Sequence, residues 1–226
     1  YAQDGQEALK PMPKTDTMPQ VRQFWNQIAT DFDAIYTGQG KSGLSRAMNK
    51  IFRKDIYERF DWVMRKSGDV RGKSICDIGC GSGRFIAEFA KNGARRVVGV
   101  DVAPNMLTLA QQLVQERGVA GPCEFVHSDV IDWKTNEKFD ETIAIGFWDY
   151  IAEPAERLRI IRKMTNEKFL SAWPRYWTWR MPVRKIRLGL AGCPVYFFKR
   201  GEVIEMIEGA GATLQFTLPL PDEETS

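Results

Sequence analysis

Residues 77–83 read Asp-Ile-Gly-Cys-Gly-Ser-Gly, so three glycines occupy alternate positions directly after an acidic residue. Glycine readily adopts positive φ angles and carries no side chain, which lets a ligand approach the backbone closely. Glycine-rich turns of this kind hold phosphates, dinucleotides or nucleosides. The choice among these ligands therefore decides much of the function.

The spacing of the glycines fits neither of the two common phosphate-binding patterns. In the dinucleotide pattern G-x-G-x-x-G, Gly79 and Gly81 match, but the third glycine position is Arg84. A phosphate loop ends in Gly-Lys-Ser/Thr, and no lysine follows Gly83. Both phosphate-binding interpretations therefore lose support.

Polar residues also close the next two segments with strand character. Asp101 closes the run VVGVD, and Ser128 with Asp129 closes CEFVHSD. Parallel strands bring their carboxyl ends to one edge of the sheet, where open α/β sheets bind ligands. A carboxylate there can accept hydrogen bonds from two hydroxyl groups.

Taken together, these motifs resemble the class I S-adenosylmethionine-dependent methyltransferases over residues 73–173, and more loosely to the end of the chain. The resemblance implies S-adenosylmethionine as cofactor. It implies that Asp101 accepts the ribose hydroxyls, that Asp129 lies near the adenine amino group and that Met106 packs on the adenine. The cofactor-binding residues carried over in this way are Asp77, Gly79, Cys80, Gly81, Gly83, Asp101, Val102, Met106, Ser128, Asp129, Val130 and Gly146.

In related enzymes the segment after the fourth strand lies beside the transferable methyl group, which here corresponds to residues 146–150. Asp149 and Tyr150 are therefore the candidate catalytic residues, to orient or deprotonate an acceptor and to donate a hydrogen bond. Their alternative roles are a helix cap and a half-buried aromatic. The D/N-P-P-F/Y pattern of amino-group methylases of nucleic acids is absent from the sequence.

A basic and aromatic stretch supplies the candidate acceptor-binding residues. From Lys168 to Gly201 there are eight Lys or Arg residues and no acidic residue. It could be a cap helix with a solvated basic face, or a lid that recognises an acidic, flat or amphipathic small molecule. Contact with an anionic membrane surface or with single-stranded nucleic acid stays open. The substrate-binding candidates are Trp148, Tyr176, Arg180 and Arg184.

Strand and helix patterns alternate from residue 73 onward, which predicts a Rossmann-like, doubly wound, mostly parallel α/β sheet with helices on both faces. We expect a flexible arm at 1–18, a helical cap at 19–70 and a cofactor-binding domain at 71–226 with an insertion at 168–200. A sixth strand is expected at 212–220. The usual seventh strand is not visible, so it is missing or the chain is a truncated piece.

The residue composition bears on metal binding and on the cellular location of the protein. The four cysteines form no C-x-x-C pair and His127 is the single histidine, so no metal site is predicted. Free thiols and the lack of a leader or membrane-spanning run favour a cytoplasmic protein. The leading prediction is methyl transfer to a small-molecule O or N acceptor, with no obligatory nucleic acid and an undetermined oligomeric state. Alternatives are an adenosylmethionine-binding protein without transferase activity, an RNA-modifying methylase and a nicotinamide dehydrogenase.

Overall fold

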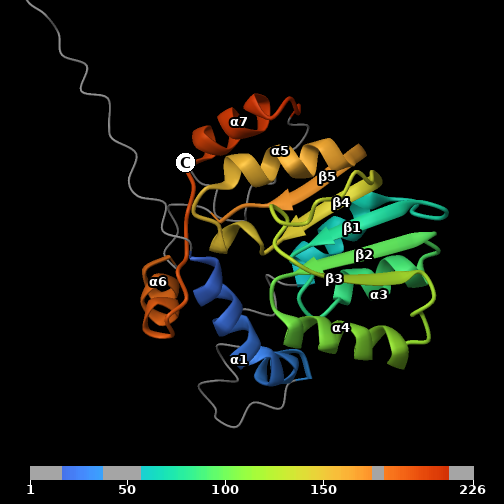
Figure 1. Ribbon diagram of the computed structural model, residues 1–226, viewed down its shortest axis with the longest axis horizontal. Helices are drawn as coiled ribbons and strands as arrows, with labels where there is room; N and C mark the ends of the chain where they lie inside the picture. Colours follow the sequence, from blue (N-terminus) through green and yellow to red (C-terminus); the bar gives the residue numbers. More distant parts are fainter. Residues whose placement is uncertain (1–16, 38–56, 175–180, 214–226) are drawn as a thin grey trace, which may run out of the picture.

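The computed structural model describes residues 17–37, 57–174 and 181–213. Within them, five strands form one sheet in the order β3-β2-β1-β4-β5, and all four pairings are parallel (Figure 1). The predicted parallel sheet is confirmed. The strands are β1 (Ser74–Ile78), β2 (Arg96–Asp101), β3 (Cys123–His127), β4 (Phe139–Ile145) and β5 (Thr165–Ala172).

The central strands are apolar because both of their faces are covered. All five residues of β1 are buried. Alternate residues point to opposite faces of a strand, so Ile75 packs in one core and Cys76 in the other.

Helices cover both faces of this sheet. One face packs against α3 (Arg84–Lys91), α4 (Pro104–Glu116) and a helix at residues 57–67. The other packs against α5 (Pro154–Met164) and α7 (Arg200–Gly209), which lie above the sheet in Figure 1. The helix boundaries follow local chemistry, since Pro104 opens α4 and Gly118, at φ 66°, follows its end.

The helix at 57–67 is fixed to the sheet by polar contacts at its carboxyl end. The Ser67 hydroxyl donates to Glu141 Oε1, which is buried in β4. Lys168 Nζ donates to the carbonyl oxygens of Lys66 and Ser67 at 2.5 and 3.3 Å. These bonds satisfy carbonyl groups that a helix end leaves open.

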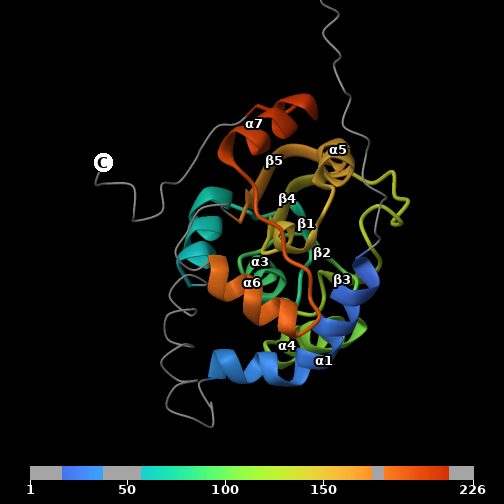
Figure 2. The ribbon, with the colours of Figure 1, turned by 90° about the vertical axis from the view of Figure 1, so that its left-hand side faces the viewer.

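Helix α1 (Met18–Thr37) lies at the side of the sheet where the strands end, next to α6 (Met181–Leu190); Figures 1 and 2 agree on this arrangement. Two hydrogen bonds join α1 to the start of α4: Asn105 N to Asn26 Oδ1 at 3.1 Å and Asn105 Nδ2 to the Asn26 carbonyl at 3.0 Å. A short 3-10 helix, η1 (Trp148–Tyr150), follows β4.

Some of the predicted elements lie partly outside the described ranges. These are the arm at 1–18, the helical cap at 19–70 and the sixth strand at 212–220. None of the helices in the described ranges combines the length and apolarity needed to cross a bilayer.

Candidate functional site

A cavity of about 280 Å³ lies at the carboxyl ends of the strands. The cavity lies at the end of β1, between its neighbours β2 and β4. At this point the strand order reverses, because β2 and β3 are added on one side of β1 and β4 and β5 on the other. Such a switch point is where open α/β sheets bind their ligands. Its lining comes from the ends of β1, β2 and β4, the turn after β3, α1 and the helix at 57–67.

The glycine-rich turn forms the floor of the cavity. Gly81 has a φ of 51°, and a Cβ built there would meet nothing within 4 Å, so its backbone is open to the cavity. At Gly83, also at positive φ, a Cβ would lie 2.6 Å from the Ala110 Cβ. Gly83 is therefore needed for the close approach of α4 and does not line the cavity, although we expected it to bind the cofactor.

Asp77 brings an unsatisfied carboxylate to the cavity. It is the fourth of the five buried residues of β1 and is 2 % exposed. Among the described residues nothing forms a hydrogen bond with its Oδ2. Burial, and then the charge of Asp101, raise the pKa of Asp77 to about 8. A buried acceptor of this kind calls for a cationic or hydrogen-bond-donating ligand group.

Asp101 stands across the turn from Asp77 and has partners on both oxygens. Its Oδ2 accepts a hydrogen bond from Gly81 N at 2.9 Å and its Oδ1 accepts one from Ala103 N at 2.8 Å. Burial raises the pKa of Asp101, and the backbone N–H donors of Ala103 and Gly81 oppose that rise. A carboxylate oxygen has two lone pairs, so each oxygen can still accept one hydroxyl group from a ligand.

The third acidic residue of the cavity, Asp129, is held by a buried ion pair. Arg157 of α5 donates from Nη2 to Asp129 Oδ2 at 2.6 Å and from Nε to Oδ1 at 3.2 Å. Their side chains are 12 % and 8 % exposed. Asp129 Oδ1 also accepts from Ile131 N at 3.2 Å. This fork-like geometry fixes the side chain and neutralises its charge.

An apolar region lies between Asp101 and Asp129. Met106 is 1 % exposed and packs with Ala103 and Ala29. Val102 and Val130 line the same cavity. A flat, weakly polar ring system would bury its faces favourably against this surface.

The lining of the cavity also includes aromatic and basic side chains. Trp25 and Tyr150 meet edge to face, with ring centroids 5.3 Å apart. Arg84 stacks over the rings of Tyr57 and Phe60, at 5.3 and 5.6 Å from the centroids. Phe147, Phe85 and Arg59 also line the cavity.

The cavity brings together most of the predicted cofactor residues. Those that line it are Asp77, Gly79, Cys80, Gly81, Asp101, Val102, Met106, Ser128, Asp129, Val130 and Gly146. Of the two catalytic candidates, Tyr150 lines the cavity and Asp149 does not. Asp149 is 2 % exposed, and its carbonyl oxygen accepts a hydrogen bond from Tyr196 N at 2.8 Å.

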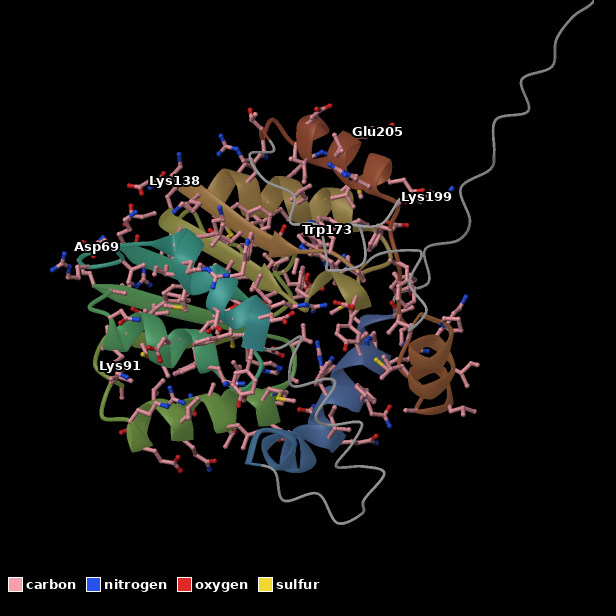
Figure 3. All side chains as sticks on the ribbon, turned by 180° about the vertical axis from the view of Figure 1, so that it is seen from behind. Asp69, Lys91, Lys138, Trp173, Lys199 and Glu205 are labelled. Carbon is pink, nitrogen blue, oxygen red and sulfur yellow. The ribbon has the colours of Figure 1, made fainter. Side chains whose placement is uncertain are left out.

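The structure places Trp148 in the core, where we expected a substrate-binding residue. Its ring is fully buried and stacks on Trp173, with centroids 4.2 Å apart and planes 5° apart (Trp173 is labelled in Figure 3). The 3-10 turn of η1 directs this side chain toward α5 and β5. Tyr176 and Arg180 lie outside the described residues, and Arg184 lies in α6 with its side chain not described.

Several residues that line the cavity or hold its lining were not predicted from the sequence. Arg59 and Phe60 belong to the helix at 57–67, and Arg157, which holds Asp129, belongs to α5. Amphipathic periodicity predicts such helices but does not tell which residue reaches a distant strand end. Val21 and Trp25 are the exception in part, because a helical cap was expected at 19–70. Met18 was expected in the flexible arm, but it begins α1 and lines the cavity.

The sheet order and the cavity at its switch point define a Rossmann-like α/β protein that binds a small ligand at its strand ends. Residues 75–167 match the family model described as a methyltransferase domain. The ubiquinone biosynthesis O-methyltransferase of Aeromonas salmonicida (strain A449) is 32 % identical over 108 residues, covering 48 % of this chain and 45 % of that protein. Cycloartenol-C-24-methyltransferase 1 of Oryza sativa subsp. japonica is 26 % identical over 151 residues, covering 66 % and 43 %.

Among solved structures, magnesium protoporphyrin IX methyltransferase from Synechocystis PCC 6803 with bound S-adenosylhomocysteine has the same fold. Its TM-score is 0.70 at 22 % identity, covering 87 % of this chain and 89 % of that one. The chain spans about half the length of the curated relatives it matches. Residues 75–167 therefore resemble a methyltransferase domain, and the solved structure shares the Rossmann-like fold that the class I S-adenosylmethionine-dependent methyltransferases use.

Proposed function

We propose that this cavity binds S-adenosylmethionine and that the chain transfers its methyl group to an O or N atom of a small molecule. The observation that carries the proposal is the buried Asp77 Oδ2, which has no hydrogen-bond partner among the described residues and lies beside the open backbone of Gly81. A ligand with an ammonium group or another hydrogen-bond donor satisfies this oxygen, whereas a phosphate ester brings no donor to it.

The residues around the cavity fit the chemical groups of that cofactor. Asp77 would hold the ammonium group, and the free lone pairs of Asp101 would accept the ribose hydroxyls. Met106, Val102 and Val130 would pack on the adenine. The carboxyl groups of Asp77 and Asp101 beside the glycine-rich turn agree with a ligand that carries an ammonium group and hydroxyl groups.

When bound, the cofactor supplies a methyl group attached to positively charged sulfur. The chain's part is to orient the acceptor and exclude water, because an in-line displacement depends on alignment. Trp25, Phe147 and Tyr150 form the apolar walls for this purpose. Of the two catalytic candidates only Tyr150 lines the cavity, which supports a role for it in hydrogen-bonding an acceptor. For Asp149, buried in η1, we propose a positioning role.

The acceptor is proposed to be acidic or amphipathic, with a flat apolar body. Arg59 and Arg84 line the cavity together with Phe60 and Phe85, and the Arg84 guanidinium lies 5.6 Å from the centroid of the Phe60 ring. Guanidinium groups pair with carboxylates, while aromatic side chains stack on flat rings. The printed names of the relatives include methyltransferases of ubiquinone biosynthesis and of magnesium protoporphyrin IX, both consistent with that class of acceptor.

The test begins with binding and ends with product. S-adenosylhomocysteine should raise the melting temperature and bind in calorimetry, whereas reduced nicotinamide dinucleotide should do neither. Methyl-labelled cofactor is then incubated with fractionated metabolites, and labelled products are identified by mass spectrometry. Binding without any labelled product would favour a non-catalytic binding protein. Labelled RNA, with steeply salt-dependent RNA binding, would favour the RNA-modifying alternative.

A further inference from the structure

Helix α6 presents an exposed apolar face that no described part of the chain covers. Only three large hydrophobic side chains in the described ranges are classed as exposed, and two of them are in this helix: Ile186 at 64 % and Leu190 at 87 %. Isolated exposed apolar residues are ordinary, but a pair four residues apart lies on one face of a helix.

The exposed residues of α6 form one continuous face. At about 100° per residue, Pro182, Lys185, Ile186, Gly189 and Leu190 fall within an arc of roughly 140°. Leu188 falls outside this arc and is 5 % exposed. Leu188 thus faces the protein core, whereas Ile186 and Leu190 face outward.

The positive charge around α6 indicates what kind of partner would cover this exposed face. Residues 175–200, which include α6, contain seven Lys or Arg and no Asp or Glu. Lys185 lies within the exposed face itself. A helix that combines an apolar face with a local excess of positive charge binds at the interface of a membrane with anionic lipids.

The position of α6 links this face to the cavity. Leu188 of α6 and the adjoining Cys193 pack in one cluster with Val21 and Tyr150, and the latter two also line the cavity. Only one layer of side chains therefore separates the cavity from α6. Figures 1 and 2 show α6 on the outside of the molecule beside α1, at the side where the strands end.

We propose that the exposed face of α6 docks the protein on the surface of a membrane that contains anionic lipids. The helix would lie in the plane of the interface, with Ile186 and Leu190 between the headgroups and Lys185 near the lipid phosphates. The docking rests on α6 and not on the proposed methyl transfer. If both proposals hold, an amphipathic acceptor dissolved in that membrane would reach a cavity next to the docking helix.

The experiment measures binding of the whole chain to vesicles by co-sedimentation. The vesicles are made of phosphatidylcholine, with or without phosphatidylglycerol. We expect clear binding to the anionic vesicles and little to the neutral ones. The double substitution Ile186→Ser/Leu190→Ser should lower the affinity by about tenfold or more, because it removes the inserting apolar surface. Both side chains are exposed, so the fold should persist, as checked by melting temperature.

A matched pair of charge reversals separates docking from general attraction. Lys185→Glu should weaken binding to anionic vesicles by about fivefold or more. Lys91→Glu, at the end of α3 and on the side of the molecule away from α6 in Figure 3, should change it by less than about twofold. Equal losses for the two reversals would overturn the proposal.

Two other results would also overturn it: no vesicle binding by the parent chain, or unchanged binding by the double serine variant. Binding of single-stranded RNA that depends on Ile186 and Leu190, in the absence of vesicle binding, would assign the face to nucleic acid instead. S-adenosylhomocysteine binding is measured on the same preparations. Its absence would contradict the proposed function without affecting the vesicle result.

Discussion

Asp77 and Asp101 are two carboxylates at adjacent strand ends whose surroundings give them different roles. Asp101 accepts two backbone N–H donors, which hold its position and favour its charged form. Asp77 has a buried oxygen without a partner among the described residues, and its pKa is raised to about 8. We therefore expect Asp77 to be protonated in the ligand-free protein near pH 7 and to lose this proton when a cationic ligand group binds beside it.

The first prediction concerns the pH dependence of ligand binding. Below pH 8 the free protein holds a proton on Asp77, and binding of an ammonium group must displace it. The dissociation constant of S-adenosylhomocysteine should therefore fall between pH 6 and 7.5, by at most about tenfold per unit. Titration calorimetry in buffers of different ionisation enthalpy measures the released proton. Asp77→Asn should bind more weakly and show a flat profile; a sloping profile in this variant would exclude Asp77 as the source.

The same pKa shift predicts how stability depends on pH. The pKa of Asp77 is about 8 in the folded state against an ordinary value of 3.8, so the unfolded chain holds fewer protons between these values. The free energy of unfolding of the ligand-free protein should therefore decrease as pH rises from about 4 to 8, by on the order of a few kcal/mol. Urea unfolding at several pH values measures this slope. Asp77→Asn should remove most of it, and an unchanged slope would contradict the assignment.

A third prediction tests Asp101. Asp101→Ala removes the acceptor for Gly81 N and Ala103 N and the proposed acceptor for the ribose hydroxyls. We expect S-adenosylhomocysteine affinity to fall by at least about tenfold, since hydrogen bonds to a charged group contribute roughly 1.5–3 kcal/mol each. Calorimetry measures the change, with Asp132→Asn, an exposed acidic residue in the turn after β3, as control. Binding as tight as that of the parent would refute the ribose assignment.

These residues could be predicted from the sequence because their signals are local. A glycine needed at positive φ and an acidic residue directly after an apolar run are both readable within ten positions. Arg59, Phe60 and Arg157 could not be predicted, because their roles depend on which helix faces reach the strand ends. Gly83 shows a limit of prediction even within the motif. The sequence predicts that glycine is needed at this position, but not that the reason is steric: a Cβ there would collide with Ala110 of α4.

At the scale of elements, the buried pair of Arg157 and Asp129 joins α5 to the turn after β3. The fourth prediction is that Arg157→Ala lowers the free energy of unfolding by about 3–5 kcal/mol, because it leaves Asp129 buried without its cation. Denaturant unfolding measures this change, with Arg159→Ala, an exposed residue of the same helix, as control. The double variant Asp129→Asn/Arg157→Met should recover much of the loss; no recovery would mean that the packing of Arg157, and not its charge, matters.

The boundaries of the elements followed the sequence pattern more closely than the directions of their side chains did. Alternating strand and helix patterns predicted all five described strands, and Pro104 and Gly118 marked α4 correctly. Trp148 was assigned to the wrong environment, because a stretch of mixed polarity after a strand leaves the turn type undetermined. The 3-10 turn decides that Trp148 enters the core and Tyr150 the cavity.

At the scale of the whole molecule, the cavity is closed by an element that precedes the sheet in the sequence. Val21 and Trp25 of α1 line the cavity, while α1 is tied to α4 by the two hydrogen bonds between Asn26 and Asn105. Helix α4 itself follows Asp101, the proposed ribose ligand. Ordering of α1 and binding of the cofactor should therefore be coupled, since each favours the same closed arrangement.

The last prediction tests this coupling with Asn26→Ala. The substitution removes the acceptor for Asn105 N and should lower the free energy of unfolding by only about 1 kcal/mol. If α1 closes the site, the affinity for S-adenosylhomocysteine should nevertheless fall several-fold, and hydrogen exchange in residues 18–29 should become faster in the free protein. Gln27→Ala, an exposed neighbour in α1, is the control. Faster exchange in α1 with unchanged affinity would separate this helix from the binding site and leave the strand ends alone as its structural basis.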